Sequence, residues 1–301
     1  MKAAVYEKFG PPEVVEIRDI EKPTPRSNEV LVRIHATTLS RGDSRMRSLD
    51  VPGNMFVRFM ARLFLGIRGP RKKILGMQLA GQVEAVGENV TKFKIGDEVF
   101  ATTYPTGFGG HAEYKCLPED TVIATKPANM SYEEAATIPI PGMGALNVLK
   151  RADIQPGQKV LVYGASGSVG TNAVQLSKYW GAEVTGVCSE SNFEMVKSLG
   201  ADNLIDYKKT DFAQTGETYD VVFDAVGKIS PSTSEGALKE DGIFLSITTQ
   251  GKEETQELIK LRQIIEEGKL ISVIDRTYPL EEIVEAHRYV DTGHKKGNVV
   301  I

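Results

Sequence analysis

The segment Val160–Gly170 constrains the fold of this chain more than any other part of its sequence. It begins with a short apolar run and continues into a loop of small residues, reading VLVYGASGSVG. The run is typical of a buried strand, and the loop has the pattern A-x-G-x-x-G at the start of a helical pattern. Small residues in such a loop let the backbone approach a pyrophosphate, whose charge is favoured at a helix N-terminus. The segment therefore predicts the strand, loop and helix of a dinucleotide-binding domain.

The surrounding sequence extends this pattern. From about 126 to 269, short apolar or β-branched runs alternate with helical patterns. The expected strands are 159–163, 183–188, 203–206, 220–224 and 242–247, and the expected helices are 168–180, 192–199 and 253–268. Continuous apolar strands alternating with helices are typical of a parallel sheet covered on both faces. We therefore expect a doubly wound α/β domain in this part of the chain.

Residues 1–125 have a different pattern. Residues 29–35 alternate polar and apolar side chains, and turns containing Gly or Pro recur, which predicts a β-rich barrel or sandwich. The segment 55–67, MFVRFMARLFLGI, is an exception because its apolar residues have helical spacing and basic residues lie in it and after it. We expect a surface helix that packs its apolar side on the barrel, with contact to a membrane or an anion as the alternative. The tail, 270–301, reads as strand, helix and strand.

Composition excludes several classes of protein. The 301 residues suit two domains of ordinary size, and the net charge of −4 argues against a nucleic-acid binder. No run approaches about 18 apolar residues, so we expect no membrane span, and the N-terminal sequence lacks the apolar core of a signal peptide. The two cysteines, Cys116 and Cys188, and four histidines cannot form a usual Cys/His zinc cluster unless carboxylates help. These features favour a cytoplasmic protein in a reducing compartment, with both thiols inert in the core.

The end of the second expected strand bears on which dinucleotide binds. NAD enzymes place an acidic residue there, whereas this chain has Ser189, followed by Asn192. Both side chains can donate hydrogen bonds to a phosphate oxygen, and Lys208 and Lys209 could add positive charge nearby. The pattern favours NADP(H). Glu190 keeps NAD open, because a shift of one residue would place its carboxylate at the ribose.

Further motifs are spread nearly from end to end of the chain. They are GMQLAGQV at 76–83, FKIGDEV at 93–99, GHAEY at 110–114, QPGQKVLV at 155–162, LGAD at 199–202, IDY at 205–207 and FDAVG at 223–227. Together these segments resemble the medium-chain dehydrogenase/reductase superfamily, in particular its zinc-free quinone oxidoreductase branch. The resemblance implies a GroES-like catalytic domain formed by 1–125 and 270–301, with a Rossmann NADP-binding domain inserted at 126–269.

The resemblance also implies the residues that contact the cofactor. Three groups match by position, around the pyrophosphate, the adenosine 2′-phosphate and the nicotinamide. The first group, with the small residues of its motif, is Ala165, Ser166, Gly167, Ser168, Val169 and Gly170; the second is Ser189, Asn192 and Tyr207; the third is Val226, Ser246, Ile247 and Thr248.

Zinc-dependent relatives carry a Cys and a Gly-His-Glu motif at places where this chain reads LSRGD at 39–43 and GMQ at 76–78. The resemblance therefore implies no metal, and hydride transfer from NADPH to a quinone or an α,β-unsaturated carbonyl. The candidate catalytic residues are Ser40, Asp43 and Tyr104. Asp43 could orient substrate or cap its loop, and Tyr104 or His111 could protonate a product enolate, although packing roles are the alternative and water suffices as donor. His287 is expected on a helix surface without a role.

Two other functions stay open. An enoyl-thioester reductase would need a basic path for a phosphopantetheine arm, which the cluster at 68–73 could provide. A non-catalytic module could bind NADPH to sense redox state or could bind RNA. The family also has a further stretch between Gly251 and Glu253, which tends to supply edge strands for dimer contact. Because that connection is short here, both a monomer and a homodimer are considered.

Overall fold

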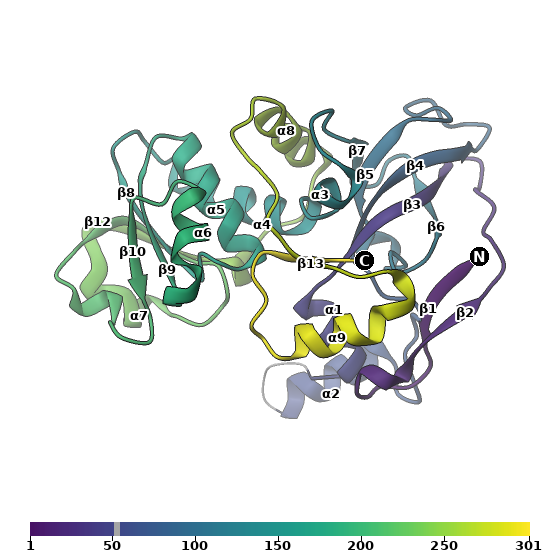
Figure 1. The fold of residues 1–301 in the computed structure, drawn as a ribbon, viewed down its shortest axis with the longest axis horizontal. Coiled ribbons are helices and arrows are strands. Elements are labelled where there is room, and N and C mark those ends of the chain that lie inside the picture. The colour runs from purple at the N-terminus through teal and green to yellow at the C-terminus, as the bar shows by residue number, and fades with distance from the viewer. Residues whose placement is uncertain (51–54) are drawn as a thin grey trace. The chain divides into compact units, whose positions relative to one another are not determined.

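The computed structural model describes residues 1–50 and 55–301 and divides into two compact units. Unit 1 consists of Met1–Ile140 and Ile274–Ile301, and unit 2 consists of Pro141–Val273 (Figure 1). Unit 2 is thus an insertion within unit 1. The domain limits near 125 and 269 that the sequence suggests stay a prediction about where the functional domains divide.

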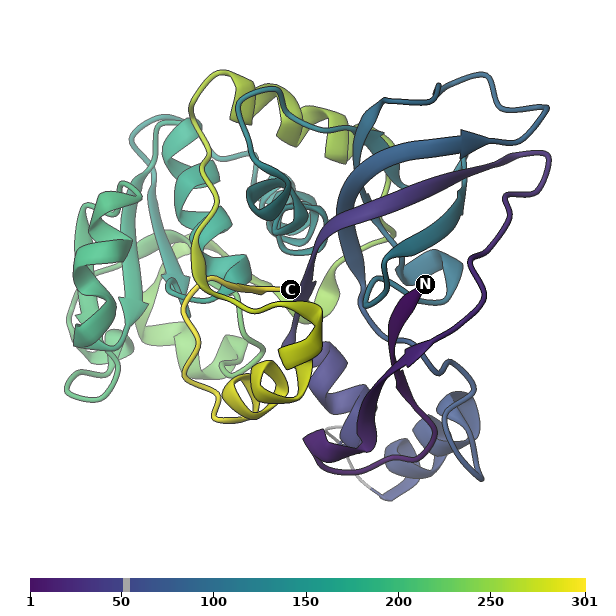
Figure 2. The ribbon, with the colours of Figure 1, turned by 45° about the vertical axis from the view of Figure 1, so that its right-hand side comes forward.

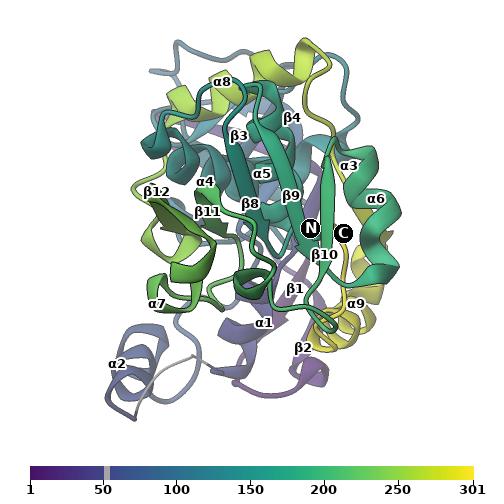
Figure 3. The same cartoon turned by 90° about the vertical axis from the view of Figure 1, so that its left-hand side faces the viewer.

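Unit 2 is built on a parallel sheet with the strand order β10-β9-β8-β11-β12 (Figure 3). The strands are β8 Lys159–Tyr163, β9 Glu183–Cys188, β10 Asn203–Asp206, β11 Tyr219–Asp224 and β12 Leu238–Ser246. The helices are α4 Pro139–Leu149, which begins in unit 1, α5 Ser168–Tyr179, α6 Phe193–Ser198, α7 Pro231–Ser234 and α8 Thr255–Glu266. The apolar runs form the buried strands because both faces of a parallel sheet are covered. The predicted doubly wound α/β domain is confirmed.

The carboxyl ends of these strands position the site. Strand order changes direction on either side of β8, so the loops that follow β8, β9 and β11 meet at one edge of the sheet. All three central residues of β8, Val160–Val162, are fully buried. This packing fixes the point at which the loop after Tyr163 begins.

Unit 1 has a seven-stranded sheet and a separate hairpin-like pair, β1 Lys2–Tyr6 with β2 Val15–Asp19 (Figure 2). The sheet has the order β13-β14-β3-β4-β5-β7, and β6 pairs with β3 as well. Its strands are β3 Glu29–Leu39, β4 Gln78–Val86, β5 Glu98–Thr102, β6 Tyr114–Pro118, β7 Ile123–Thr125, β13 Ile274–Thr277 and β14 Asn298–Val300. The helices are α1 Arg41–Ser48, α2 Met55–Leu65, α3 Tyr132–Ala136 and α9 Ile283–Asp291. The expected β-rich domain is confirmed, and β14 closes it by pairing with the end of β3.

Helix α2 is present where the sequence predicts it, but the expected packing of its apolar side is wrong. Met55, Phe56 and Phe59 are 87%, 69% and 59% exposed. Helical spacing shows which side chains share a face, but it does not show whether another element covers that face.

His287 is also placed differently from the expectation. It is fully buried in α9, on the face that also carries Ile283, Ala286 and Val290. The spacing i, i+3, i+4 and i+7 is the signal that could have revealed this position. Its ring stands edge-on to His111 at 6.4 Å between centroids, and both ring nitrogens are buried without a hydrogen bond to the described residues.

The burial of His287 leads to a prediction for stability against pH. Burial, aided by His111 and Arg47, lowers the pKa of His287 to about 2, whereas in the unfolded chain the pKa is about 6.5. Below about pH 6.5, His287 is therefore protonated in the unfolded state but stays neutral in the folded state. The free energy of unfolding consequently falls by about 1.4 kcal/mol for each unit that the pH is lowered. From pH 7 to pH 5 the parent protein should lose about 2 kcal/mol more than His287→Leu in urea unfolding. Equal losses in the two proteins would contradict this assignment.

Candidate functional site

The loop after β8 is held against β9 by its own backbone. Gly164 has φ of 82°, and the N–H groups of Gly164 and Ala165 both donate to the carbonyl of Val187, at 2.9 and 3.1 Å. The N–H of Gly167 then donates to the carbonyl of Gly164 at 3.0 Å. Helix α5 begins at Ser168, and no side chain caps its N-terminus at Gly167. The loop thus delivers an uncapped helix N-terminus to the carboxyl edge of the sheet, where an anion is stabilised.

The glycines of this loop serve two different purposes. A Cβ on Gly170 would lie 2.1 Å from the carbonyl oxygen of Gly164, so only glycine lets α5 start this close to the loop. A Cβ on Gly167 would meet its nearest neighbour, the same oxygen, at 3.4 Å, so the space above Gly167 is open. Tight packing beneath the loop and open space above it form a cradle that fits a dinucleotide pyrophosphate.

A cluster of polar side chains lies beside the cradle. The amide nitrogen of Asn192 donates to the hydroxyls of Ser166 and Ser189, both at 3.1 Å. The amide oxygen of Asn192 is buried and has no hydrogen bond to any described residue. The structure thus brings together three residues that the sequence pattern assigns to the cofactor, at the ends of β8 and β9. Their hydroxyl and amide groups suit a phosphate or a ribose.

Glu190 is the residue that leaves NAD as an alternative cofactor on the sequence alone. In the structure its carboxylate forms an ion pair. Its carboxylate accepts from the ammonium of Lys209 at 2.6 Å, and both side chains are largely exposed. The ion pair raises the pKa of Lys209. The Lys209 charge therefore offsets that of Glu190 at this end of the sheet. Tyr207, assigned to the same part of the cofactor, follows β10 and is 52% exposed.

Asp224 organises the third loop, a role that the sequence pattern did not reveal. It is fully buried at the end of β11 and accepts from the N–H groups of Val226 and Gly227, at 3.1 and 2.9 Å. Its second oxygen accepts from the N–H of Ile229 at 3.3 Å and from the hydroxyl of Ser246 at 3.5 Å. A buried acid at the end of an apolar strand, followed by Gly, is the signal for such a turn.

The residues assigned to the nicotinamide lie on the turns around Asp224. Val226 is 43% exposed, and Ser246 caps the short helical turn Ile247–Thr249 by accepting from the N–H of Thr248. The hydroxyls of Ser246 and Thr248 are 2.9 Å apart. These side chains are available at the carboxyl edge of the sheet, and their contact with a nicotinamide stays a prediction.

In unit 1, Ser40 and Asp43 form a capping box at the start of α1. The Asp43 carboxylate is fully buried and accepts from the N–H and hydroxyl of Ser40, at 2.9 and 2.6 Å, and from the N–H of Gly76 at 3.0 Å. The geometry supports the loop-capping alternative for Asp43, which fixes the position of the Ser40 hydroxyl.

Tyr104 and His111 differ in exposure. Tyr104 is 55% exposed and stands edge-on to Phe108, whereas His111 is buried with its Nε2 at 3.0 Å from the carbonyl oxygen of Thr38. An exposed phenol can reach a substrate, so Tyr104 stays a candidate proton donor. His111 is used in packing.

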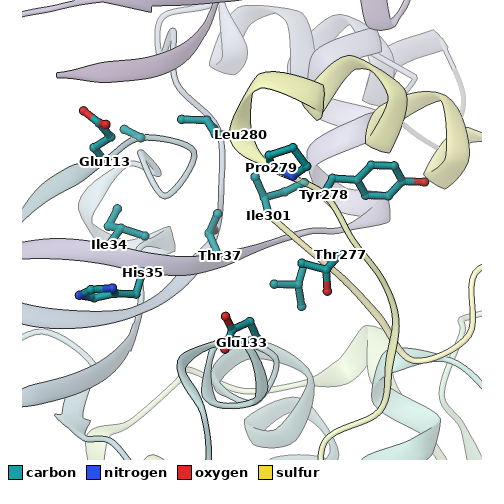
Figure 4. Close-up of a pocket in the computed structure, with 12 residues that line it drawn as sticks. Ile34, His35, Thr37, Glu113, Glu133, Thr277, Tyr278, Pro279, Leu280 and Ile301 are labelled. Carbon is teal, nitrogen blue, oxygen red and sulfur yellow. The ribbon is translucent and has the colours of Figure 1, made fainter.

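A pocket of about 350 Å³ lies within unit 1 (Figure 4). His35, Glu113 and Glu133 contribute polar groups, and Leu280 and Ile301 contribute apolar ones. Burial and the nearby Arg33 charge lower the pKa of His35. None of the residues predicted for the site lines this pocket.

The remaining candidates for chemistry are the two cysteines and possible metal ligands. Burial raises the pKa of Cys188 to about 11 and that of Cys116 also to about 11, so both thiols stay protonated at neutral pH. Cys116 is half-buried rather than buried. Within residues 1–50 and 55–301, no three His, Cys, Asp or Glu side chains are grouped so as to hold a metal ion.

Comparisons with known proteins match both units. Residues 26–128 match the family model "Alcohol dehydrogenase GroES-like domain", and residues 168–290 match "Zinc-binding dehydrogenase". A 2-methylene-furan-3-one reductase from Solanum lycopersicum is 32% identical over all of this chain and 79% of its own length. An NADPH-dependent alkenal/one oxidoreductase from Arabidopsis thaliana is 31% identical with the same coverage. The solved structure of a quinone oxidoreductase from Coxiella burnetii is 31% identical with a TM-score of 0.87, covering 100% of this chain and 98% of that one.

Proposed function

The chain belongs to the quinone oxidoreductase branch of the medium-chain dehydrogenase/reductase superfamily, and we propose that it transfers hydride from NADPH to a quinone or an α,β-unsaturated carbonyl compound. The observation that carries the proposal is the cradle at Gly164–Gly170 with the Ser166–Asn192–Ser189 cluster beside it. Relatives named for NADPH-dependent reduction of alkenals and for quinones support the same substrate class.

Different groups around the cradle bind different parts of the cofactor in this proposal. The N-terminus of α5 and the open space above Gly167 hold the pyrophosphate, because unpaired N–H groups and the helix dipole favour negative charge there. Ser189 donates a hydrogen bond from its hydroxyl to the 2′-phosphate, and Asn192 holds that hydroxyl in place by donating to it. Asp224 holds the turn that carries Val226, and it thereby fixes the position of Val226 beside the nicotinamide.

When bound, reduced nicotinamide supplies the hydride. A quinone or an enone is electrophilic enough to need little beyond orientation and one or two hydrogen bonds. In this proposal Asp43 is a positioning residue that holds the Ser40 hydroxyl, and the exposed Tyr104 hydroxyl donates a proton to the reduced acceptor. Water can replace that donor, so Tyr104→Phe should lower turnover modestly rather than abolish it.

Two measurements test the function. Fluorescence titration should show tighter binding of NADPH than of NADH, and NADPH oxidation should be fastest with quinones or enones in a panel that includes enoyl thioesters. Binding of NADH about tenfold more tightly than NADPH would overturn the cofactor assignment. Faster turnover of enoyl thioesters would favour an enoyl-thioester reductase, and tight NADPH binding without oxidation of any acceptor would favour a non-catalytic sensor.

Replacing Ser189 by Asp tests the 2′-phosphate contact directly. A carboxylate at this place repels the phosphate but can accept from ribose hydroxyls, so the Kd for NADPH should rise at least about tenfold while that for NADH changes little. Ser198→Asp, which adds the same charge at an exposed end of α6, is the matched control. An equal loss for both dinucleotides would mean that Ser189 does not face the 2′-phosphate.

A further inference from the structure

Helix α2 presents an apolar face that no other element covers extensively in the described part of the chain. Met55, Phe56, Phe59 and Met60 are 87%, 69%, 59% and 47% exposed, and Ile67 just after the helix is 58% exposed. Their spacing places the four helical side chains on one side of α2. Figure 1 shows α2 at the lower margin of unit 1. A soluble surface rarely exposes so many large apolar side chains together unless they bind something.

The sequence of this segment is strongly basic. The segment 55–73 contains six basic residues and no acidic one, in a chain whose net charge is −4. The basic residues are Arg58, Arg62, Arg68, Arg71, Lys72 and Lys73. Lys73 forms an ion pair with Glu7. Arg68, Arg71 and Lys72 are exposed and have no carboxylate within ion-pair distance in the part of the chain that the structure describes.

The combination of apolar and basic groups indicates which partner covers the face. Helices with Phe, Leu or Met on one side and Arg or Lys at its margin bind in the interface of anionic membranes, the apolar side chains among the headgroups and the cations near lipid phosphates. A second copy of this chain would bring two cationic surfaces together, which like-charge repulsion opposes. None of the described helices has the length and hydropathy to cross a bilayer.

We propose that the 55–73 surface, formed by α2 and the described residues that follow it as far as Lys73, is an interfacial anchor that binds anionic lipid headgroups. The anchor lies on the membrane and does not insert across it. The inference is independent of the hydride-transfer proposal, because none of the residues that it uses has a role in that proposal.

Flotation of the full-length protein with vesicles tests the anchor. Vesicles of phosphatidylcholine with about one-third phosphatidylserine should bind the protein at low salt, and vesicles of phosphatidylcholine alone should bind at least about tenfold less. Raising the salt from about 0.05 M to about 0.5 M should release most of the bound protein, because screening weakens contact with the lipid phosphates. Absence of binding to the anionic vesicles, or equal binding to both kinds, would overturn the proposal.

Two sets of substitutions separate the apolar and the basic contributions. Phe56→Ser with Phe59→Ser, and Arg68→Gln with Arg71→Gln and Lys72→Gln, should each lower the partition coefficient at least about tenfold. The matched control, Lys197→Gln with Lys260→Gln and Lys269→Gln, removes the same charge from exposed positions in unit 2 and should change binding less than about twofold.

The same variants exclude the other occupants of the face. NADPH titration and thermal melting of each variant should match the parent protein, which shows that loss of vesicle binding is not loss of fold. Vesicle binding that survives both sets of substitutions would overturn the proposal. So would a parent dimer that the Phe56→Ser, Phe59→Ser variant converts to a monomer, because a second copy would then cover the face.

Discussion

Gly170→Ala is expected to lose most of its affinity for NADPH and to lower the free energy of unfolding by about 3 kcal/mol. The added Cβ would lie 2.1 Å from the carbonyl oxygen of Gly164 and 2.8 Å from the Cα of Ala165. Both neighbours are backbone atoms, so no side chain can turn away to make room. Helix α5 must therefore move from the loop, and its N-terminus leaves the place where the pyrophosphate is bound. Urea unfolding and NADPH titration measure the two effects.

Gly167→Ala is the matched control, because it places the same methyl group three residues earlier in the same loop. Its nearest neighbour would lie at 3.4 Å, and the φ of −83° suits alanine. Stability should change by less than about 0.5 kcal/mol, while the methyl group in the cradle weakens NADPH binding about tenfold. If Gly170→Ala is as stable as the parent protein and binds NADPH equally well, then neither property requires the close approach of α5 to the loop.

The second large effect is expected at the ion pair between a buried arginine of α1 and a partly exposed aspartate of α9. Arg47 is 1% exposed, and its Nη2 donates to the carboxylate of Asp291 at 2.6 Å. Its Nε and Nη1 are buried with no hydrogen bond to any described residue. Asp291→Ala leaves the guanidinium buried without its counter-charge, which should lower the free energy of unfolding by about 3–5 kcal/mol.

A double variant shows whether the uncompensated charge is the cause. Arg47→Met with Asp291→Ala removes both charges and leaves an apolar chain of similar length, so it should recover most of the stability that Asp291→Ala loses. Two of the three guanidinium nitrogens already lack partners, so little hydrogen bonding is lost with Arg47. A double variant no more stable than Asp291→Ala in urea unfolding would instead assign the effect to the Ser44 hydroxyl, which also donates to Asp291.

The strands of unit 2 could be predicted because each contains a continuous apolar or β-branched run. The exception is the start of β12, which begins at Leu238 although Lys239, Glu240 and Asp241 interrupt the pattern. Local spacing gives the period of an element but not its neighbours. His287 is buried because α1 and the loop carrying His111 pack near it. The apolar face of α2 is exposed because no described element packs extensively on it.

The same distinction applies to the site. The small residues at 165–170 form a local pattern that predicts a loop at a helix N-terminus, whereas the hydrogen bond from Asn192 to Ser166 joins residues on different loops. Asp224 is one residue of a recognisable motif, yet its role as the centre of a turn follows only from burial and from the N–H groups that face it. Ser40 and Asp43 could be paired from their spacing, since Ser followed by an acid three residues later is typical of a capping box.

The short connection from β12 to α8 is closed by specific contacts. The amide oxygen of Asn147 accepts from the N–H of Gly251 at 3.0 Å, and its amide nitrogen donates to Glu257 at 2.9 Å. Lys150 forms an ion pair with the same Glu257 carboxylate. These contacts join α4, the connection and α8, so the short connection is held in place without the further stretch that the family resemblance implies.

Strand β12 pairs with β11 and forms one margin of the parallel sheet of unit 2. The pairing shifts register between Tyr219 and Val221, so that Leu238 lies opposite Tyr219 and Ile243 lies opposite Val221, with the residues between them outside the regular ladder. Only Ile243–Ser246 continues the ladder in regular register. A stretch this short, preceded by a charged bulge, is a poor template for a foreign strand. This edge of the sheet should therefore resist pairing with a strand of another molecule.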